Sequence, residues 1–432
     1  MTLERIFKLK ENNTSPRTEV IGGVTTFMTM AYILIVNPSI LAAAGMDSGA
    51  VFTATAVSSF VACVMMGVVA NLPVALAPGL GINSFFAYTV VLQMGYSWEM
   101  ALAAVFIEGI IFILLSIFNI REAIICSIPL VLKRAIGVGI GLFIATIGLV
   151  NSGIITKGVV FSELGDITSA PVLLTLFAIV AIGVLVARRV GGALLLGMVL
   201  TAIVGVVFGV VTIPEGFSPI ALPSSIEPIL FKMDFSQIFS LDMLVVIFTL
   251  IFADLLDTAG ALFAVCSNSG LVDSKGNVVR AKQAFLSDAL ATTIGAMLGT
   301  SPVTSYVEST AGVAAGGRTG LTAVVTGVLF IFALLFAPLF ALIPTAATSA
   351  VLVVVGLLMV VAVVDIDFRD IKDALPAFIT ILFIPLSYSI AEGIVYGLLS
   401  YVIIRIFLGR FRDVSPLMYI LAALFIIKEF FV

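Results

Sequence analysis

The sequence predicts an all-α polytopic membrane protein with about fourteen transmembrane segments, arranged as two inverted seven-span repeats. Of its 432 residues, 61% are hydrophobic and 11% are charged, whereas a soluble domain carries roughly 25% charged residues. Many apolar blocks reach the length of about 20 residues that a spanning helix needs. Two stretches, one in each half of the chain, also share the same interruption by Pro and Gly.

Hydropathy and the positions of Gly and Pro place the individual spans. The sequence lacks long segments with strand-like alternation, so helices rather than a barrel are expected to satisfy the backbone in lipid. The expected spans cover residues 19–44, 50–70, 73–94, 97–119, 134–151, 170–187, 191–211, 242–266, 281–298, 302–316, 320–340, 345–363, 374–389 and 391–409, and an apolar tail covers 415–432.

The distribution of Lys and Arg predicts the orientation, because cytoplasmic loops are enriched in both. With a cytoplasmic N-terminus, eighteen of the 21 basic residues lie inside, Lys157 and Lys232 lie outside, and Lys428 lies in the tail. We therefore expect a multi-pass protein of the cell membrane. Its expected parts are a cytoplasmic segment at 1–17, the first repeat at 18–211, an extracytoplasmic linker at 212–240, the second repeat at 241–409 and a cytoplasmic or interfacial tail at 410–432.

The residue types exclude several kinds of chemistry. The chain has no histidine, which excludes His-based zinc sites, Ser-His-Asp triads and His proton shuttles. Its three cysteines, Cys63, Cys126 and Cys266, lie in apolar blocks and do not form a metal or disulfide pattern. The stretch "GVGIGLFIATIG" is a span, not a phosphate-binding loop after a strand. We expect no enzyme activity, no cofactor, no metal and no nucleic-acid partner.

The shared interruption predicts the centre of the fold. One half contains "FVACVMMGVVANLPVALAPGLGINSFFAY" and the other "ALATTIGAMLGTSPVTSYVESTAGVAAGG". Aligned on Pro73 and Pro302, the copies are 229 residues and an odd number of spans apart, so they are inverted in the membrane, as in secondary transporters. The short extended runs are expected to pair, and the half-helices that follow would point free N–H groups into the gap. The alternative is two ordinary kinked spans with small residues for close packing.

Charged side chains inside spans are costly and usually functional. The stretch "FADLLDTAGALF" carries Asp254 and Asp257 on one helical face, and the repeat offset pairs Asp254 with Thr25 of the first span. Asp288 lies in the middle of the next span, and Glu308 lies within the second interruption. Close carboxyl groups in a medium of low polarity favour protonation of at least one, so this group is expected to carry a proton together with a solute.

Each carboxylate also has a structural interpretation. Asp257 would brace the unwound run through backbone N–H groups, Asp288 would join two helices, and Glu108 would be a protonated carboxyl bonded to a neighbouring span. Asp254 and Glu308 have the strongest functional case. Because spans lack deep basic residues, the site favours a neutral heterocycle or a cation over sulfate or phosphate.

At these residues the chain resembles a known family, the azaguanine-type (AzgA-like) purine permeases of the nucleobase–cation symporter superfamily. The resemblance rests on "TEVIGGVTTFMTMAYILIVNP", "ALAPGLGINSFFAYTVV", "FADLLDTAGALF" and "GTSPVTSYVESTAGVAAGGRTGLTAVVTG". It implies uptake of hypoxanthine or guanine, or of adenine, by proton symport. It also implies a core domain of spans 1–4 and 8–11, a gate domain of spans 5–7 and 12–14, short strands in spans 3 and 10, and a homodimer.

The resemblance also implies roles for particular residues. It places Asp254, Glu308, Asn83 and Gly81 at the substrate, and Asp288 at a position tied to coupling. Together with the offset, the predicted substrate site is Asp254, Glu308, Asn83, Gly81 and Thr25, and the predicted proton-coupling set is Glu308, Asp254, Asp288 and Asp257. The alternatives are a uracil or xanthine permease of the same fold, an anion exchanger, and a membrane enzyme.

Overall fold

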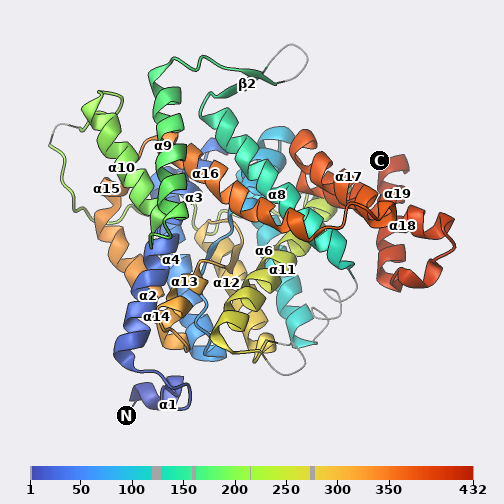
Figure 1. The fold of residues 1–432 in the computed structure, drawn as a ribbon, viewed down its shortest axis with the longest axis horizontal. Coiled ribbons are helices and arrows are strands. Elements are labelled where there is room, and N and C mark those ends of the chain that lie inside the picture. The colour runs from blue at the N-terminus through green and yellow to red at the C-terminus, as the bar shows by residue number, and fades with distance from the viewer. Residues whose placement is uncertain (1, 119–127, 158–161, 215, 273–277, 432) are drawn as a thin grey trace.

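The fold is a bundle of helices with two short paired strands at its centre (Figure 1). The computed structural model describes residues 2–118, 128–157, 162–214, 216–272 and 278–431. Cys126 and two of the basic residues used for the orientation, Arg121 and Lys275, lie outside these ranges. Cys63 and Cys266 are free, buried thiols.

The first repeat follows the expected order. It comprises α2 (Pro16–Met30) with α3 (Ile33–Ala43), α4 (Ser48–Met65) with η1 (Met66–Ala70), β1 (Leu76–Pro78) with α5 (Leu80–Ser84) and η2 (Phe85–Gln93), α6 (Trp98–Ile117), α8 (Leu130–Asn151), α9 (Ala170–Ala187) and α10 (Ala193–Val207).

The second repeat has the same succession of elements. It comprises α11 (Leu241–Ser269), α12 (Ala281–Leu298), β4 (Val303–Ser305) with α13 (Ser309–Ala314), α14 (Gly320–Ala333) with η3 (Leu334–Phe336) and α15 (Ala337–Ala341), α16 (Thr345–Val360) with η4 (Val361–Asp365), α17 (Ile371–Ser387) and α18 (Ile390–Phe407).

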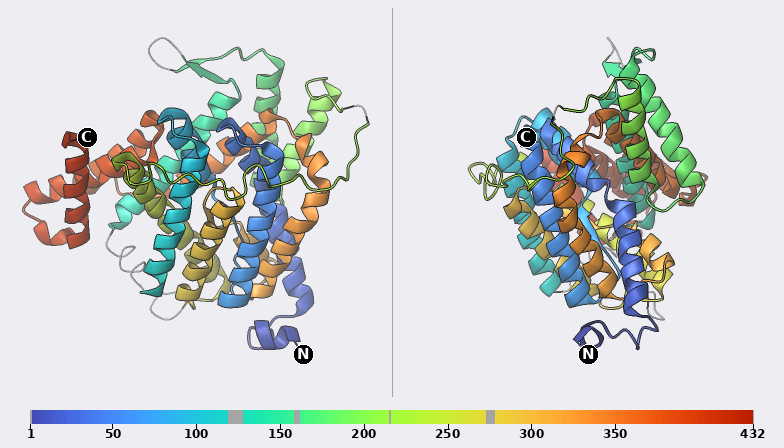
Figure 2. Two further views of the ribbon diagram at one scale, coloured as in Figure 1. Left: turned by 180° about the vertical axis from the view of Figure 1, so that it is seen from behind. Right: turned by 90° about the vertical axis from the view of Figure 1, so that its left-hand side faces the viewer.

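The remaining elements lie outside the two repeats. A short helix, α1 (Thr2–Phe7), precedes them, and a hairpin of β2 (Ile155–Lys157) and β3 (Ser162–Leu164) joins α8 to α9. The tail begins with η5 (Phe411–Asp413) and forms α19 (Pro416–Phe431), which packs against α18. The left view of Figure 2 places α19 (red) and α10 (green) at opposite edges of the bundle.

Each of the fourteen expected spans overlaps a helix or a strand–helix pair. Within the described residues, nine helices are long and apolar enough to cross a membrane on their own. The other expected spans do not meet these limits of length and hydropathy, and the structure shows why. Spans 3 and 10 are broken by strands, α10 and α17 are short, and α12 carries polar side chains along its length.

The helix contacts have the symmetry that two inverted repeats require. The contact of α4 with α14 is matched by that of α12 with α6, and the contact of α2 with α14 is matched by that of α11 with α6. The pair α9 and α10 likewise corresponds to α17 and α18, and the pair α9 and α16 to α17 and α8. Exchanging the repeats therefore reproduces the contact pattern, which confirms the predicted repeat architecture.

The same contacts divide the bundle into two groups of helices. The core group contains α2 to α6 and α11 to α14, and the gate group contains α8, α9, α10, α16, α17 and α18. Within each group, glycines allow helices to approach closely. Gly67 meets Gly320 in the core group, and Gly141 meets Gly356 in the gate group.

The glycine contact in the core group gives a first prediction. In Gly320→Ala the new Cβ would overlap the carbonyl oxygen and the Cα of Gly67, and overpacking of this kind costs about 1–3 kcal/mol. We expect a lower midpoint of thermal unfolding for the detergent-purified variant. Gly183→Ala in α9 is the control, because its Cβ would meet no atom within 4 Å. Equal midpoints for the two variants would contradict the close approach.

Candidate functional site

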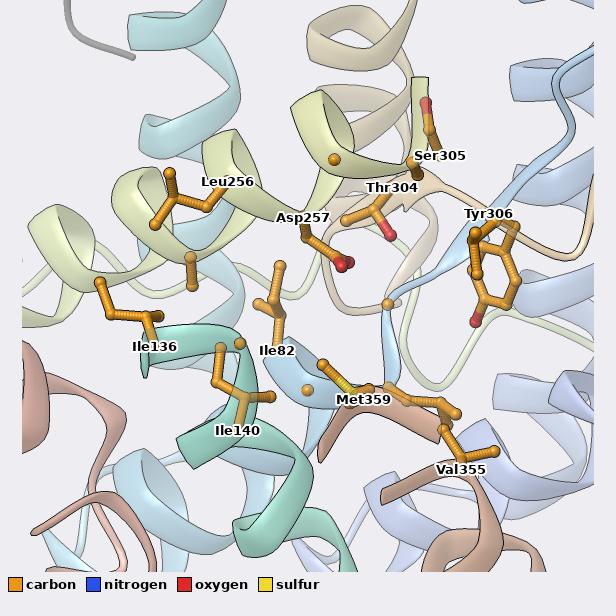
Figure 3. Close-up of a pocket in the computed structure, with 18 of the residues that line it drawn as sticks. Ile82, Ile136, Ile140, Leu256, Asp257, Thr304, Ser305, Tyr306, Val355 and Met359 are labelled. Carbon is orange, nitrogen blue, oxygen red and sulfur yellow. The ribbon is translucent and has the colours of Figure 1, made fainter. Parts of the chain in front are cut away.

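A cavity of about 400 Å³ lies between the two groups of helices, within the range of roughly 300–1,000 Å³ that is usual for small-molecule sites. Figure 3 shows Asp257, Thr304 and Tyr306 on one side of it. The core group supplies these polar residues. The gate group supplies Lys133 and an apolar wall, whose residues are Ile136, Ile140, Val355 and Met359.

Two paired strands lie next to the cavity, and Thr304 and Ser305 of β4 line it. β1 and β4 are antiparallel, with Leu76 opposite Ser305 and Pro78 opposite Val303. β4 begins directly after Pro302, whereas β1 begins three residues after Pro73. The pairing satisfies backbone groups of both broken spans, since Gly79 also donates its N–H to the Pro302 carbonyl at 3.0 Å.

The helix after β1 directs backbone donors toward the cavity. α5 starts at Leu80, and residues 79–82 all line the cavity. The first N–H groups of a helix have no acceptor within that helix. The start of α5 therefore offers backbone donors to a carbonyl or ring nitrogen of a bound solute. Gly81 lies here, as predicted, and its missing side chain leaves room beside Ile140.

Two carboxylates face the cavity. Asp257 comes from α11, and Glu308 comes from the residue before α13. The Tyr32 hydroxyl donates to Glu308 Oε1 at 2.6 Å, which fixes one oxygen and leaves the other available. In Figure 3 the Asp257 carboxylate lies next to Thr304. Both carboxylates are only partly buried, because the cavity reaches them.

Hydroxyl groups complete the polar side of the cavity. Tyr306 donates to the Pro78 carbonyl at 2.5 Å, so its ring is held against β1. Ser305 Oγ is buried and has no hydrogen-bond partner among the residues that the structure describes. A buried polar atom without a partner is costly. A solute in the cavity would supply the missing bond.

Asp254, predicted at the substrate and in the proton-coupling set, and Asp288, predicted in the proton-coupling set, lie behind the cavity rather than in it. Each is fully buried, and neither lines the cavity. Thr258 joins them, since its hydroxyl lies 3.1 Å from Asp254 Oδ1 and 2.8 Å from Asp288 Oδ1. The structure therefore brings Asp257, rather than Asp254, to the side of Glu308.

Asn83 and Thr25 also lie away from the cavity. Asn83 is buried and donates from Nδ2 to Asn37 Oδ1 at 2.9 Å. Asn37 in turn donates to Thr55 at 2.8 Å and to Thr300 at 3.0 Å. Thr25 donates to the backbone of its own helix. Among the described residues, no group of three or more His, Cys, Asp or Glu side chains is suited to a metal ion.

The predicted site residues did not include Tyr32, Thr304, Ser305 or Tyr306, all of which line the cavity. The strand after Pro302 was predicted, and its alternation would have assigned Thr304 and Ser305 to opposite faces. No pattern in the sequence around Tyr32 indicated that it would line the cavity. It lies in the first span and reaches Glu308 only through the contact between repeats.

Comparison with known proteins agrees with this architecture. Residues 17–396 match a protein-family model described as "Permease family". The chain is 45% identical to the guanine/hypoxanthine permease PbuG of Bacillus subtilis, over 99% of this chain and all of that protein. It is 42% identical to the adenine permease AdeP of Escherichia coli, over 100% of this chain and 96% of that protein.

Solved structures share the fold at low sequence identity. The transmembrane domain of the cyanobacterial bicarbonate transporter BicA superposes with a TM-score of 0.64 at 17% identity, over 88% of this chain and 96% of that one. The structure of SLC26A9 superposes with a TM-score of 0.65 at 13% identity, over 90% of this chain and 65% of that one.

The buried amide network gives a second prediction. Asn37→Ala removes an acceptor for Asn83 and Ser301 and a donor to Thr55 and Thr300. Buried groups left without partners cost about 1–3 kcal/mol. We expect a lower thermal midpoint than for Asn268→Ala, which loses only a surface bond to Ala264 of its own helix. A midpoint for Asn37→Ala equal to that of the control would show that the network does not stabilise the fold.

Proposed function

We propose, from the premise that this chain belongs to the permease family, that it imports purine nucleobases by proton symport. The family and the many apolar helices make it a multi-pass membrane transporter rather than an enzyme. The base, the coupling ion and the site residues are parts of the proposal.

The observation that carries the proposal is the pairing of Asp257 and Glu308 on one wall of the cavity. Carboxylate oxygens accept hydrogen bonds in pairs from adjacent N–H donors. Guanine presents two such donors, N1–H and its 2-amino group, along one edge, and hypoxanthine presents N1–H on the same edge. The backbone N–H groups at the start of α5 are available to the carbonyl oxygen of the base. The apolar gate wall would cover the flat face of the ring.

The relatives guide the choice of base. PbuG is named for guanine and hypoxanthine, and AdeP for adenine. We propose hypoxanthine and guanine as the main solutes and adenine as a further one. A uracil or xanthine permease is the alternative, and competition by unlabelled bases would distinguish these possibilities.

The distribution of charge supports coupling to protons. Asp257 and Glu308 share the cavity, and Asp254 and Asp288 lie behind it. Crowding and poor hydration favour the protonated form of a carboxyl group, so such groups gain and lose protons closer to neutral pH than isolated surface groups do. We propose that Glu308 and Asp257 hold the base, while Asp254 and Asp288 take part in proton coupling.

Orientation and assembly belong to the same proposal. We infer a cytoplasmic N-terminus in the cell membrane from the excess of basic residues on that side. We also propose a homodimer that uses apolar faces of the gate group. The repeat boundaries at 18–211 and 241–409, with a linker at 212–240, remain proposals of the same kind.

An anion exchanger of the same fold is disfavoured by the cavity itself. BicA and SLC26A9 share the fold, and their names refer to bicarbonate and to a solute carrier. In this chain, however, Asp257 and Glu308 face the cavity. Both would repel an anion, and these two carboxylates outnumber Lys133, the basic residue among those that line the cavity.

Uptake by cells that lack their own purine permeases tests the proposal. We expect radiolabelled hypoxanthine to accumulate, and a protonophore to abolish the accumulation. Glu308→Gln and Asp257→Asn each remove a charged acceptor worth about 1.5–3 kcal/mol, so uptake efficiency should fall roughly 10-fold to 100-fold. Glu227→Gln on the exposed linker is the matched control.

Three results would contradict parts of this proposal. Uptake that resists the protonophore would exclude proton coupling. Uptake of uracil in preference to purines would exclude the proposed solute. Wild-type accumulation by Glu308→Gln, with normal amounts of protein in the membrane, would remove Glu308 from the working site.

A further inference from the structure

Thr258 stands between two carboxyl groups that the cavity does not reach. Its hydroxyl oxygen lies 2.8 Å from Asp288 Oδ1 on α12 and 3.1 Å from Asp254 Oδ1 one turn earlier on α11. All three residues are fully buried. The two carboxyl groups therefore meet at a single hydroxyl, away from water.

The number of hydrogens at this contact is limited. A threonine hydroxyl has one hydrogen to donate and two lone pairs that accept. If it donates to one carboxylate, the other carboxyl oxygen faces a lone pair, and that contact is favourable only when the carboxyl carries a proton and donates it to the hydroxyl. Two ionised carboxylates at one buried hydroxyl would also repel each other strongly. One proton on the pair satisfies both contacts.

We propose that Thr258 is a positioning residue that makes Asp254 and Asp288 share one proton, and that this proton is the one transported with the solute. The inference rests on the proposed function and assigns base binding and proton binding to different residues. Asp257 and Glu308 would bind the base in the cavity, while the shared proton lies one layer behind them.

Thr258 also connects the shared proton to the cavity. The backbone N–H of Ser305 lies 3.5 Å from the Thr258 hydroxyl. Ser305 belongs to β4, which lines the cavity and leads to Glu308. The Ser305 N–H donates to the same hydroxyl oxygen that accepts from a protonated carboxyl of the pair, so loss of the proton changes the bonding of the oxygen that contacts the strand. Loss of the proton is therefore expected to affect β4, the strand that lines the cavity and precedes Glu308.

The charges around the pair determine whether the proton and the base strengthen or weaken each other's binding. Besides the pair, Asp257 lies on the same helix, Glu308 follows β4, and Glu108 is buried on α6, which packs against α11 and α12. All three are acidic. A proton on the pair lowers the negative charge nearby and favours ionised Asp257 and Glu308, which accept hydrogen bonds from the base. Proton and base should therefore bind cooperatively, each strengthening the other.

Uptake measured against external pH tests the role of Thr258. Thr258→Val keeps the shape and removes the hydroxyl, and Thr258→Ser keeps the hydroxyl. We expect Thr258→Val to lower proton-driven accumulation about tenfold, the effect of losing one hydrogen bond to a charged group, and to flatten the pH profile. Exchange of labelled for unlabelled hypoxanthine at equal pH should fall much less. Thr258→Ser should restore both accumulation and pH profile.

A matched control separates this role from a packing defect. Thr293→Val on α12 removes a buried hydroxyl that donates to the Ala289 carbonyl of its own helix. It should keep the wild-type pH profile. If Thr258→Val shows the wild-type profile too, or if Thr258→Ser fails to restore it, the proposal is wrong.

Infrared difference spectroscopy of the purified protein gives a readout that needs no solute. A shared proton predicts a buried carboxylic-acid C=O band that disappears in Asp254→Asn and in Asp288→Asn and shifts in Thr258→Val. It should persist in Asp257→Asn. A band absent from the wild type, or unaffected by either replacement in the pair, would overturn the inference. This result stands whatever base the protein carries, so failure of the proposed function is recognised separately by the uptake assay.

Discussion

The requirement that every backbone polar group find a partner away from water governs the centre of this fold. Two spans are interrupted in the middle of the bundle, and unwound backbone is tolerated there only when protein covers it. The pairing of β1 with β4 meets that requirement for both repeats at once. Because the pairing fixes where the following helices start, it also fixes where their free N–H groups and Glu308 lie.

Polar groups around these strands form two separate layers. Tyr32, Asp257 and Glu308 face the cavity, whereas Asp254, Thr258 and Asp288 bond to one another behind it. β4 contacts both, because Thr304 and Ser305 line the cavity and the Ser305 N–H lies 3.5 Å from the Thr258 hydroxyl. A change in protonation or binding in one layer can thus reach the other through the three residues of β4.

The sequence predicted the architecture well because its signals there are local and repeated. The paired Pro-Val interruptions indicated both strands, and Glu308 followed from its place in the second one. The assignment of Asp254 and Asp257 was harder, since residues three apart share a helical face, and only the packing of α11 decides which one reaches the cavity. The family resemblance of span 3 predicted Asn83 at the solute, but its side-chain amide donates a hydrogen bond to Asn37 instead. Tyr32 depends on a contact across 276 positions of the chain, which spacing along one segment does not reveal.

The two walls of the cavity differ in chemistry, and this difference bears on how a solute could be released. Hydrogen-bonding groups come from the core group, while the gate group presents Ile136, Ile140, Val355 and Met359. Apolar contacts are not directional, so such a wall can slide or separate without leaving polar groups unpaired. A base held by Asp257 and Glu308 would then stay with the core group during such a movement. Selectivity and release would therefore depend on different helices, and a substitution in the gate wall should alter the rate of transport more than the choice of base.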